Sequence, residues 1–373
     1  MTTEQHLSQT DLLQEFVKTG RNHPYLAFTL NSICNLDCVF CKPRCMPDYG
    51  HKDKTLTVAD YAGIAQEAGR WGIRKAHCSG GEPTLRADIL DIIGALANGL
   101  GDKATIGMTS HGNLRRGLTV DKLRDAGLTY LNISLHSLDP SRSSEIMGGG
   151  DPRISRATID RALELGLKVK INCVLQRSYL DDAFGVAELA KQLPIAVRLI
   201  ELQNIGPAEA LFPTEFVPEA EVRDRLHTWF EQAGEISRTE LGVRSPGRYL
   251  QPPGWAGSIG FISNSSCATC SDANRIKVTP TGIARPCILH NRDIPLKEYL
   301  ADGTMADAYA HLFRAMLERN GNEAWQGFHY VDYDLRWDRM ERPQGVPVLP
   351  LLPMASSGTG GGCSLRQAAG EGE

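Results

Sequence analysis

Residues 34–41 read CNLDCVFC and place Cys34, Cys38 and Cys41 on one short loop. The residues before them, 25–33, form an apolar run that predicts a buried strand. Three thiolates this close together can hold three irons of a four-iron cluster and leave the fourth iron without a protein ligand. The alternative is a closed zinc site with Cys45 as the fourth thiolate, although zinc sites more often pair two short hooks across a longer spacer.

A second motif follows about forty residues later, where residues 79–84 read SGGEPT after the apolar run 74–78. Gly80 and Gly81 allow the backbone to approach a ligand closely. The exposed carbonyls and the carboxylate of Glu82 can bind an ammonium group, and Pro83 suits the first turn of a helix. Alone, this motif would most often be a turn.

Strand and helix patterns alternate along the first two hundred residues. Apolar runs typical of strands cover residues 25–33, 74–78, 105–109, 130–135, 167–175 and 196–202. Helical patterns lie at residues 58–71, 89–100, 120–126, 154–165 and 183–193. Six such units predict an α/β fold with a parallel sheet, either an open twisted sheet or a partial barrel. Both motifs follow the carboxyl end of a strand, where α/β barrels place their active sites.

Together, the cysteine loop and the GGEP motif resemble the radical S-adenosylmethionine (SAM) superfamily, and Phe40 fits that resemblance. It implies a partial (β/α)6 TIM barrel with a [4Fe-4S] cluster on Cys34, Cys38 and Cys41. In that superfamily the open iron binds SAM.

A second cysteine group comprises Cys267, Cys270 and Cys287, with residues 280–282 predicting the turn of a hairpin. By spacing alone, zinc completed by His290 and an iron–sulfur cluster are equally good interpretations. The order of segments over roughly residues 15–325, including this group, is similar to the MoaA family of GTP 3′,8-cyclases. That resemblance implies a second [4Fe-4S] cluster, which holds the substrate, and an auxiliary-cluster domain at the C-terminal end.

The resemblance divides the chain into an extension (1–20), a radical SAM barrel (21–210), an auxiliary-cluster domain (211–340) and a tail (341–373). The tail is rich in Pro, Gly and Ser, which predicts disorder. Helical patterns are also expected at residues 218–233 and 296–320. Cys45, Cys78, Cys173 and Cys363 are interpreted as structural or incidental.

The resemblance also implies site residues. For SAM they are Phe40, Gly80, Gly81, Glu82, Pro83, Ser134 and Gln203. For the substrate they are Arg21, His77, Ser110, Lys170, Arg198, Asn274, Arg275 and Lys277. No side chain is assigned as a general acid or base.

The match is weakest among the substrate residues. The family has Arg where this chain has His77, Met where it has Gln203, and Thr-Thr-Asn-Gly where it has residues 109–112, TSHG. Residues 271–273 are additional, and Lys277 replaces an Arg. We therefore expect a relative that acts on a different substrate.

Composition sets further limits. The 373 residues are 42% hydrophobic with a net charge of -4, which excludes the strongly basic surface of a general nucleic-acid binder. No apolar run is long enough to span a bilayer and the first residues are polar, so we expect a cytoplasmic protein. Ten cysteines in a reducing compartment indicate metal or redox chemistry.

The predicted function is reductive cleavage of SAM to a 5′-deoxyadenosyl radical. This radical abstracts hydrogen from a nucleotide or phosphorylated sugar and so drives cyclisation or C–C bond formation. Such chemistry implies an electron donor such as a flavodoxin or ferredoxin, and no nucleic-acid or membrane partner; a homodimer is one of the oligomeric states left open. The alternatives are a genuine GTP 3′,8-cyclase, a peptide-modifying radical SAM enzyme and a zinc-stabilised binding protein without catalysis.

Overall fold

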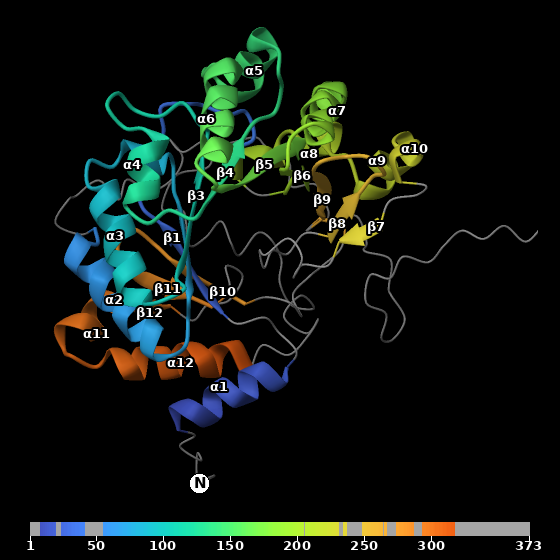
Figure 1. Ribbon diagram of the computed structural model, residues 1–373. Helices are drawn as coiled ribbons and strands as arrows, with labels where there is room; N and C mark the ends of the chain where they lie inside the picture. Colours follow the sequence, from blue (N-terminus) through green and yellow to red (C-terminus); the bar gives the residue numbers. More distant parts are fainter. Residues whose placement is uncertain are drawn as a thin grey trace, which may run out of the picture.

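A computed structural model of the chain shows an α/β fold built on one continuous sheet (Figure 1). The structure describes residues 8–19, 24–41, 55–204, 206–230, 234–236, 248–263, 265–266, 274–286 and 293–317. Within these residues the strand order is β12 (Ile294–Pro295), β11 (Ile283–Arg285), β10 (Arg275–Val278), β1 (Tyr25–Thr29), β2 (Lys75–Ser79), β3 (Thr105–Ser110), β4 (Tyr130–Ser134), β5 (Lys168–Leu175), β6 (Ala196–Glu201), β9 (Ser258–Ile262), β8 (Arg248–Gln251) and β7 (Gly234–Ile236).

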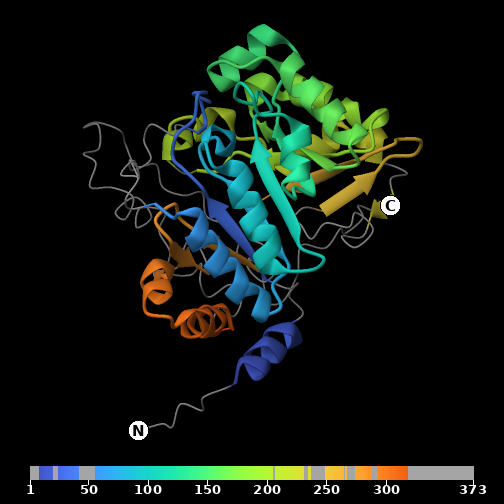
Figure 2. The ribbon, with the colours of Figure 1, turned by 60° about the vertical axis from the view of Figure 1, so that its left-hand side comes forward.

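Strands β1 to β6 are parallel and lie side by side in chain order, which confirms the predicted strand–helix units. The segments that connect these strands contain the helices α2 (Val58–Arg70), η3 (Pro83–Leu85), α3 (Ile89–Leu100), α4 (Val120–Asp125), α5 (Pro140–Met147), α6 (Pro152–Glu164), η4 (Arg177–Tyr179), α7 (Leu180–Ala187) and η5 (Glu188–Lys191). They cover one face of the sheet (Figure 2). These helices leave the opposite face of the sheet available for a functional site.

The sheet curls around that second face. Four strand spacings separate β2 from β6, which is roughly 19 Å in a flat sheet. The charge of Arg198 on β6 nevertheless lowers the pKa of His77 on β2, and only the burial of His77 has a larger effect on that pKa. The Lys75 ammonium lies over the rings of both Tyr25 and Tyr130, 4.5 and 5.5 Å from their centres. Strands β1, β2, β4 and β6 therefore surround a common interior.

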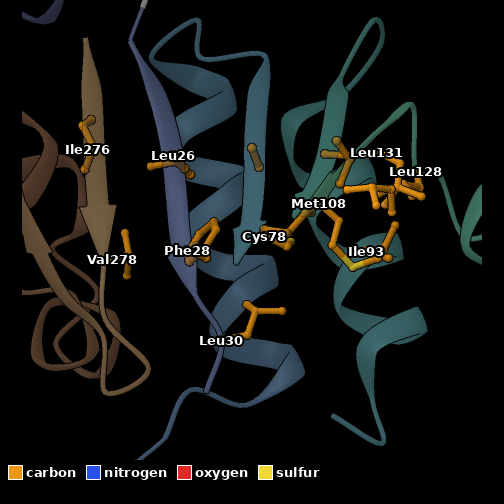
Figure 3. Packing of buried hydrophobic residues seen from close by; sticks show 14 of the residues in the cluster. Leu26, Phe28, Leu30, Cys78, Ile93, Met108, Leu128, Leu131, Ile276 and Val278 are labelled. Atoms are coloured by element: carbon orange, nitrogen blue, oxygen red, sulfur yellow. The ribbon is translucent and has the colours of Figure 1, made fainter. Parts of the chain in front are cut away.

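Strand alternation separates this interior from the hydrophobic core. Leu26, Phe28, Cys78 and Met108 point toward the helices and are buried in one cluster (Figure 3). Their neighbours in the chain, such as His77 and Thr109, point inward. The same strands thus supply an apolar core on one side and a polar interior on the other.

The chain after β6 extends both edges of the sheet. Its helices are η6 (Gly206–Glu209), α8 (Phe212–Glu215), α9 (Glu219–Arg225), α10 (His227–Phe230), α11 (Leu296–Ala301) and α12 (Met305–Leu317). Strand β9 pairs in parallel with β6, and β10 pairs in parallel with β1. The predicted hairpin is confirmed, since β10 and β11 are antiparallel neighbours.

Some elements differ from the sequence prediction. Strand β1 ends at Thr29 instead of residue 33, because the following backbone turns to bond with the segment after β2. Helix α5 was not expected; Asp139 caps it and Pro140 is its first residue. Helix α1 (Gln9–Lys18) was also not expected, and it packs on α12 through Phe16 and Phe313. Short polar helices with a narrow apolar stripe give a weak periodic signal.

Candidate active site

The loop that carries Cys34, Cys38 and Cys41 is fixed on a small apolar cluster of its own. Leu36 is buried against Ile146 and Met147 at the end of α5, and the side chains of Cys34, Cys38 and Phe40 pack on this group. The amides of Asp37 and Val39 donate to the carbonyls of Met147 and Ile146, at 3.0 and 2.9 Å. Helix α5 therefore holds the far side of the cysteine loop.

The three thiols form one electrostatic group. Desolvation raises the pKa of Cys38 to about 12, with further contributions from Cys41 and Cys34. The pKa values of Cys34 and Cys41 are also raised, mainly by desolvation. Soft thiolates grouped on one apolar loop suit an iron–sulfur cluster, and ligation would supply the positive charge that stabilises them as thiolates.

A mononuclear zinc ion makes a different demand on these sulfurs, since each must lie about 2.3 Å from the same metal. Within the described ranges, no group of three or more His, Cys, Asp or Glu side chains is arranged to hold a metal ion. A four-iron cluster stands between its thiolates and keeps them farther apart than a single ion does. Cys45 lies outside the described residues.

The GGEP segment packs directly against the stem of the cysteine loop. The amide of Gly81 donates to the Asn31 carbonyl at 2.8 Å, and that of Glu82 donates to the Ile33 carbonyl at 2.7 Å. A Cβ on Gly81 would lie 2.2 Å from the Ile33 oxygen. Close approach of two backbones is thus one physical reason for glycine here.

Glu82 is buried, with 2% of its surface exposed, and protein groups already bond its carboxylate. Oε1 accepts from the amide and the hydroxyl of Thr84, and Oε2 accepts from the amide of His111 at 3.0 Å. Pro83 is buried as the first residue of η3. Glu82 therefore helps to hold together the cysteine loop and the GGEP segment at the carboxyl ends of the strands, which form the mouth of the barrel. Its predicted contact with SAM stays a prediction.

The other residues predicted to bind SAM lie around the same mouth. Phe40 packs edge-on against His136, with ring centres 5.0 Å apart. Ser134 is the last residue of β4, and Gln203 follows the end of β6. All three are partly exposed. The carboxyl ends of parallel strands meet at one edge, which is where these residues gather.

The interior below this mouth is rich in positive charge. Lys170 and Arg198 are 3% and 8% exposed, and Arg275 is half-buried. Burial lowers the pKa of Lys170 to about 6, helped by Arg198 and Lys75. The Lys170 ammonium contacts the Tyr249 hydroxyl at 3.5 Å, and the Arg275 Nε donates to the Tyr25 hydroxyl at 2.7 Å. None of these three cations has a salt bridge to another described residue.

His77 faces the same interior but is not positioned as an anion ligand. Its Nδ1 lies 2.9 Å from the Tyr130 hydroxyl and its Nε2 lies 2.8 Å from the Thr109 hydroxyl. Burial, followed by the charges of Arg198 and Lys75, lowers its pKa well below the usual value. A neutral ring with both nitrogens engaged can contact a substrate only by giving up one of these bonds.

Several predicted substrate residues are brought to the interior and others are not. Lys277 pairs in register with Ala27 and Asn274 precedes β10, which places both beside Arg275. Ser110 lies on the other face of β3 from Thr109, and its hydroxyl accepts from the Gly112 amide. Arg21, Cys267, Cys270, Cys287 and His290 lie outside the described residues.

Sequence reasoning missed a set of interior residues that the curled sheet brings together: Tyr25, Lys75, Thr109, Tyr130, Asn132, Asn172 and Tyr249. The available signal was the strand alternation, because Lys75, Asn132 and Asn172 are each two residues from a predicted site residue on the same strand.

Glu201 at the end of β6 was expected at this edge of the sheet but was not assigned as a site residue. Its Oε2 accepts from the amides of Ser265 and Ser266, at 3.1 and 2.9 Å. Oε1 accepts from the amide of Glu219 at 2.9 Å. The described residues directly before Cys267 are therefore anchored at the carboxyl end of a barrel strand.

Comparison with known proteins agrees with this arrangement. Residues 29–188 match the family model of the radical SAM superfamily, and residues 195–325 match that of the Molybdenum Cofactor Synthesis C family. A GTP 3′,8-cyclase of Clostridium perfringens is 33% identical over 287 residues, which are 77% of this chain and 87% of that protein. The chain belongs to the MoaA-like family of radical SAM enzymes.

More distant relatives extend the comparison. A GTP 3′,8-cyclase of Syntrophomonas wolfei is 32% identical over 79% of this chain and 90% of its own length. Human molybdenum cofactor biosynthesis protein 1 is 31% identical over 80% of this chain and 46% of that protein. In the MoaA-like family the first cluster and SAM are expected cofactors, and the cysteine loop of this chain fits them. No helix among the described residues is long and apolar enough to cross a membrane.

Among solved structures, SuiB of Streptococcus suis bound to S-adenosylmethionine superposes with a TM-score of 0.57. The match covers 79% of this chain and 70% of SuiB at 16% sequence identity. At that identity the likeness concerns the fold. It confirms the expected α/β architecture.

Proposed function

We propose that this enzyme acts on a phosphorylated substrate, a nucleotide or a sugar phosphate, held in the barrel interior below the SAM site. The observation that carries the proposal is the group of Lys170, Arg198 and Arg275, which share the interior without a salt bridge to any described carboxylate. Burying a basic group without a partner costs free energy, either because it stays charged or because, like Lys170, it loses its proton. An anionic ligand would remove that cost, and Arg suits the geometry of phosphate.

Unpartnered polar atoms in the same interior indicate what else the substrate offers. Arg198 Nε, Asn132 Oδ1 and Asn172 Oδ1 are buried and make no hydrogen bond within the described structure. Leaving such an atom unsatisfied costs about 1–3 kcal/mol. Arg198 needs an acceptor such as a phosphate oxygen, whereas the two carbonyl oxygens need donors such as hydroxyl or amine groups. A nucleotide or a sugar phosphate provides both.

The residues of this chain would position the substrate, neutralise its charge and keep water away from it. The cluster and SAM, when bound, supply one-electron cleavage of SAM to methionine and a 5′-deoxyadenosyl radical that takes a hydrogen atom from the substrate. Cys34, Cys38 and Cys41 would hold the cluster, and the mouth around Gly81 and Ser134 would hold SAM. Lys170, Arg198 and Arg275 would fix the substrate phosphate. The curled sheet would shield the substrate from water while it cyclises or forms a C–C bond.

GTP is the second, more specific candidate. Relatives at 32–33% identity that match over most of their length are named GTP 3′,8-cyclase. The interior cations suit a triphosphate as well as a smaller anion. Against GTP stands the neutral His77, since the family resemblance places an Arg at that position. A second cluster on Cys267, Cys270 and Cys287 belongs to this proposal too.

One experiment tests these candidates together. Protein reconstituted anaerobically should contain about eight irons per chain if both cysteine groups bind clusters. With dithionite and SAM, 5′-deoxyadenosine formation is then measured alone and with GTP, other nucleotides, sugar phosphates and the matching dephosphorylated compounds. We expect at least about tenfold stimulation by one phosphorylated compound and none by its dephosphorylated form.

The outcomes are distinct. Stimulation by GTP supports the cyclase candidate, and stimulation by another phosphorylated compound supports a changed substrate. Stimulation by an uncharged compound or a peptide would overturn the proposal. A colourless protein with zinc and no iron would exclude radical chemistry altogether.

A further inference from the structure

His111 lies between the two motifs that define the mouth of the barrel. It follows directly after β3 and is buried, with 5% of its surface exposed. Its Nε2 is 2.9 Å from Asn35 Oδ1 in the cysteine loop and 3.3 Å from Glu82 Oε2 in the GGEP segment. It is thus a side-chain link between these two loops.

The bond on the other ring nitrogen fixes which atom carries the proton. Nδ1 accepts the amide hydrogen of Asn113 at 3.0 Å, so in the neutral ring Nε2 is the donor. That hydrogen is directed at Asn35 Oδ1, and the Glu82 carboxylate lies beside the same nitrogen. The ring therefore acts as a fixed donor toward the cysteine loop.

Glu82 extends the link to the base of the loop. Its backbone amide donates to Ile33, and its carbonyl oxygen accepts from the side-chain amide of Asn31 at 3.0 Å. Its carboxylate accepts from the His111 amide. Glu82 holds the stem of the cysteine loop, whereas the His111 ring contacts Asn35, which is the residue next to Cys34.

The rest of the loop has different supports. Beyond Asn35, backbone bonds from Asp37 and Val39 tie it to α5, and before Asn35, the Ile33 carbonyl ties it to Glu82. Asn35 itself is exposed and lies between these two supports. The His111 ring therefore fixes the part of the loop where Cys34 leaves the stem.

We propose that His111 is a positioning residue that sets the cysteine loop at the correct distance and angle from the GGEP segment. The proposal rests on the proposed function only in placing a cluster on Cys34, Cys38 and Cys41. The proposal does not depend on which substrate the enzyme binds. Loosening the link would let the cluster and the SAM site shift relative to each other, which weakens SAM binding and changes the surroundings of the cluster.

Two substitutions separate the two sides of the ring. In His111→Gln, the longer amide reaches toward Asn35 and Glu82 with an N–H donor, but the acceptor for Asn113 is lost. In His111→Asn, the amide oxygen lies near the position of Nδ1 and accepts from Asn113, but nothing reaches Asn35. Asn35→Ala removes the same link from the other side at an exposed position that does not threaten folding.

Three measurements are made on each variant. Hydrogen exchange of residues 31–41 is followed in the protein without its cluster. The KM for SAM and the kcat are measured for substrate-independent SAM cleavage with dithionite. The midpoint potential and EPR spectrum of the reconstituted cluster are recorded with and without SAM.

We expect His111→Asn and Asn35→Ala to speed exchange in residues 31–41 and to raise the KM for SAM about five- to tenfold. We expect His111→Gln to stay within about twofold of the wild type. If exchange and the KM for SAM rise in His111→Gln and stay normal in His111→Asn, then His111 stabilises only its own loop and the proposal is wrong. Unchanged exchange, KM and potential in Asn35→Ala would also overturn it. A failure to find a phosphorylated substrate affects none of these readouts.

Discussion

The two ends of the barrel interior are stabilised in opposite ways. At the mouth, backbone bonds fix the cysteine loop to Glu82 and Gly81, and protein groups satisfy the Glu82 carboxylate. Deeper inside, Lys170 and Arg198 share a buried space with no described salt-bridge partner, and Asn132 Oδ1 has no hydrogen bond. The backbone bonds of the first region are in place without a ligand, and its buried unpartnered atoms are Asn31 Oδ1 and Asp37 Oδ1. In the second region the unpartnered groups include charged side chains.

The residues predicted to bind the cluster and SAM thus lie in a different region from those predicted to bind the substrate. The mouth is built by backbone geometry, which tolerates little change. The deep interior is built by side-chain charge, which can be altered one residue at a time. His77 is such an alteration, because its neutral ring bonds to Tyr130 and Thr109 where the family resemblance implies a cation.

The largest effect should come from adding a methyl group at the mouth. In Gly81→Ala, the new Cβ would overlap the Ile33 carbonyl, whose oxygen is 2.2 Å from that position. The cysteine loop must then move. We expect substrate-independent SAM cleavage to fall about 100-fold, since a shift near 1 Å at a reacting centre has effects of that size.

Gly185→Ala is the matched control for this change. Gly185 lies within α7, and a Cβ there would meet no atom within 4 Å. This variant should keep full activity and gain about 0.5–1 kcal/mol of unfolding free energy, because Ala favours helix more than Gly does. Equal activity in both variants would show that the mouth is not as rigid as the bonds indicate.

A smaller effect is expected from Lys170→Met in the deep interior. The pKa of Lys170 is about 6 in the fold against 10.5 for a free side chain, so folding near pH 7 must release a proton. The unfolded chain binds more protons between these values, and stability therefore rises as the pH rises from 6 to 10.5. Removing the amine should stabilise the protein at pH 7 and flatten this pH dependence, because folding no longer has to release the proton.

The same variant should lose anion binding. Sulfate, whose charge is constant over this range, should raise the melting temperature of the wild type more at pH 6 than at pH 8, because binding favours protonated Lys170. Lys170→Met should show little of this shift. Lys168→Met, two residues earlier and exposed, should behave like the wild type. A destabilised Lys170→Met protein would show that Lys170 is already satisfied without a ligand.

The smallest effect is expected from replacing the two buried cysteines that lie outside the cysteine loop. Cys78 and Cys173 are fully buried on the core side of β2 and β5, and burial raises the pKa of Cys78 to about 12 (Figure 3). Cys78→Ala and Cys173→Ala should each lower the free energy of unfolding by about 1 kcal/mol. Iron content per chain should not change. A loss of iron from either variant would move that cysteine from the core to the cluster chemistry.

The sequence predicted the strands, the parallel sheet and the cysteine loop well, because periodicity and cysteine spacing are local signals. It could not show that the His111 amide bonds the Glu82 carboxylate, since that contact crosses from one loop to another, whereas the bonds from Thr84 are local. Nor could it show that Ser110 lies on the outer face of β3, because one residue at a strand's end decides the face. Helix α5, which supports Leu36, was missed for its short and polar sequence.

The α/β architecture and the cysteine and GGEP motifs could be predicted from the sequence, because each depends on residues close together along the chain. Which side chains share the interior depends on how the sheet curls. Lys170, Arg198 and Arg275 come from three other strands than His77, and they act on that histidine because the sheet curls. The net charge of -4 gives no sign of this positive interior, since charge summed over a chain says nothing about where the fold collects it.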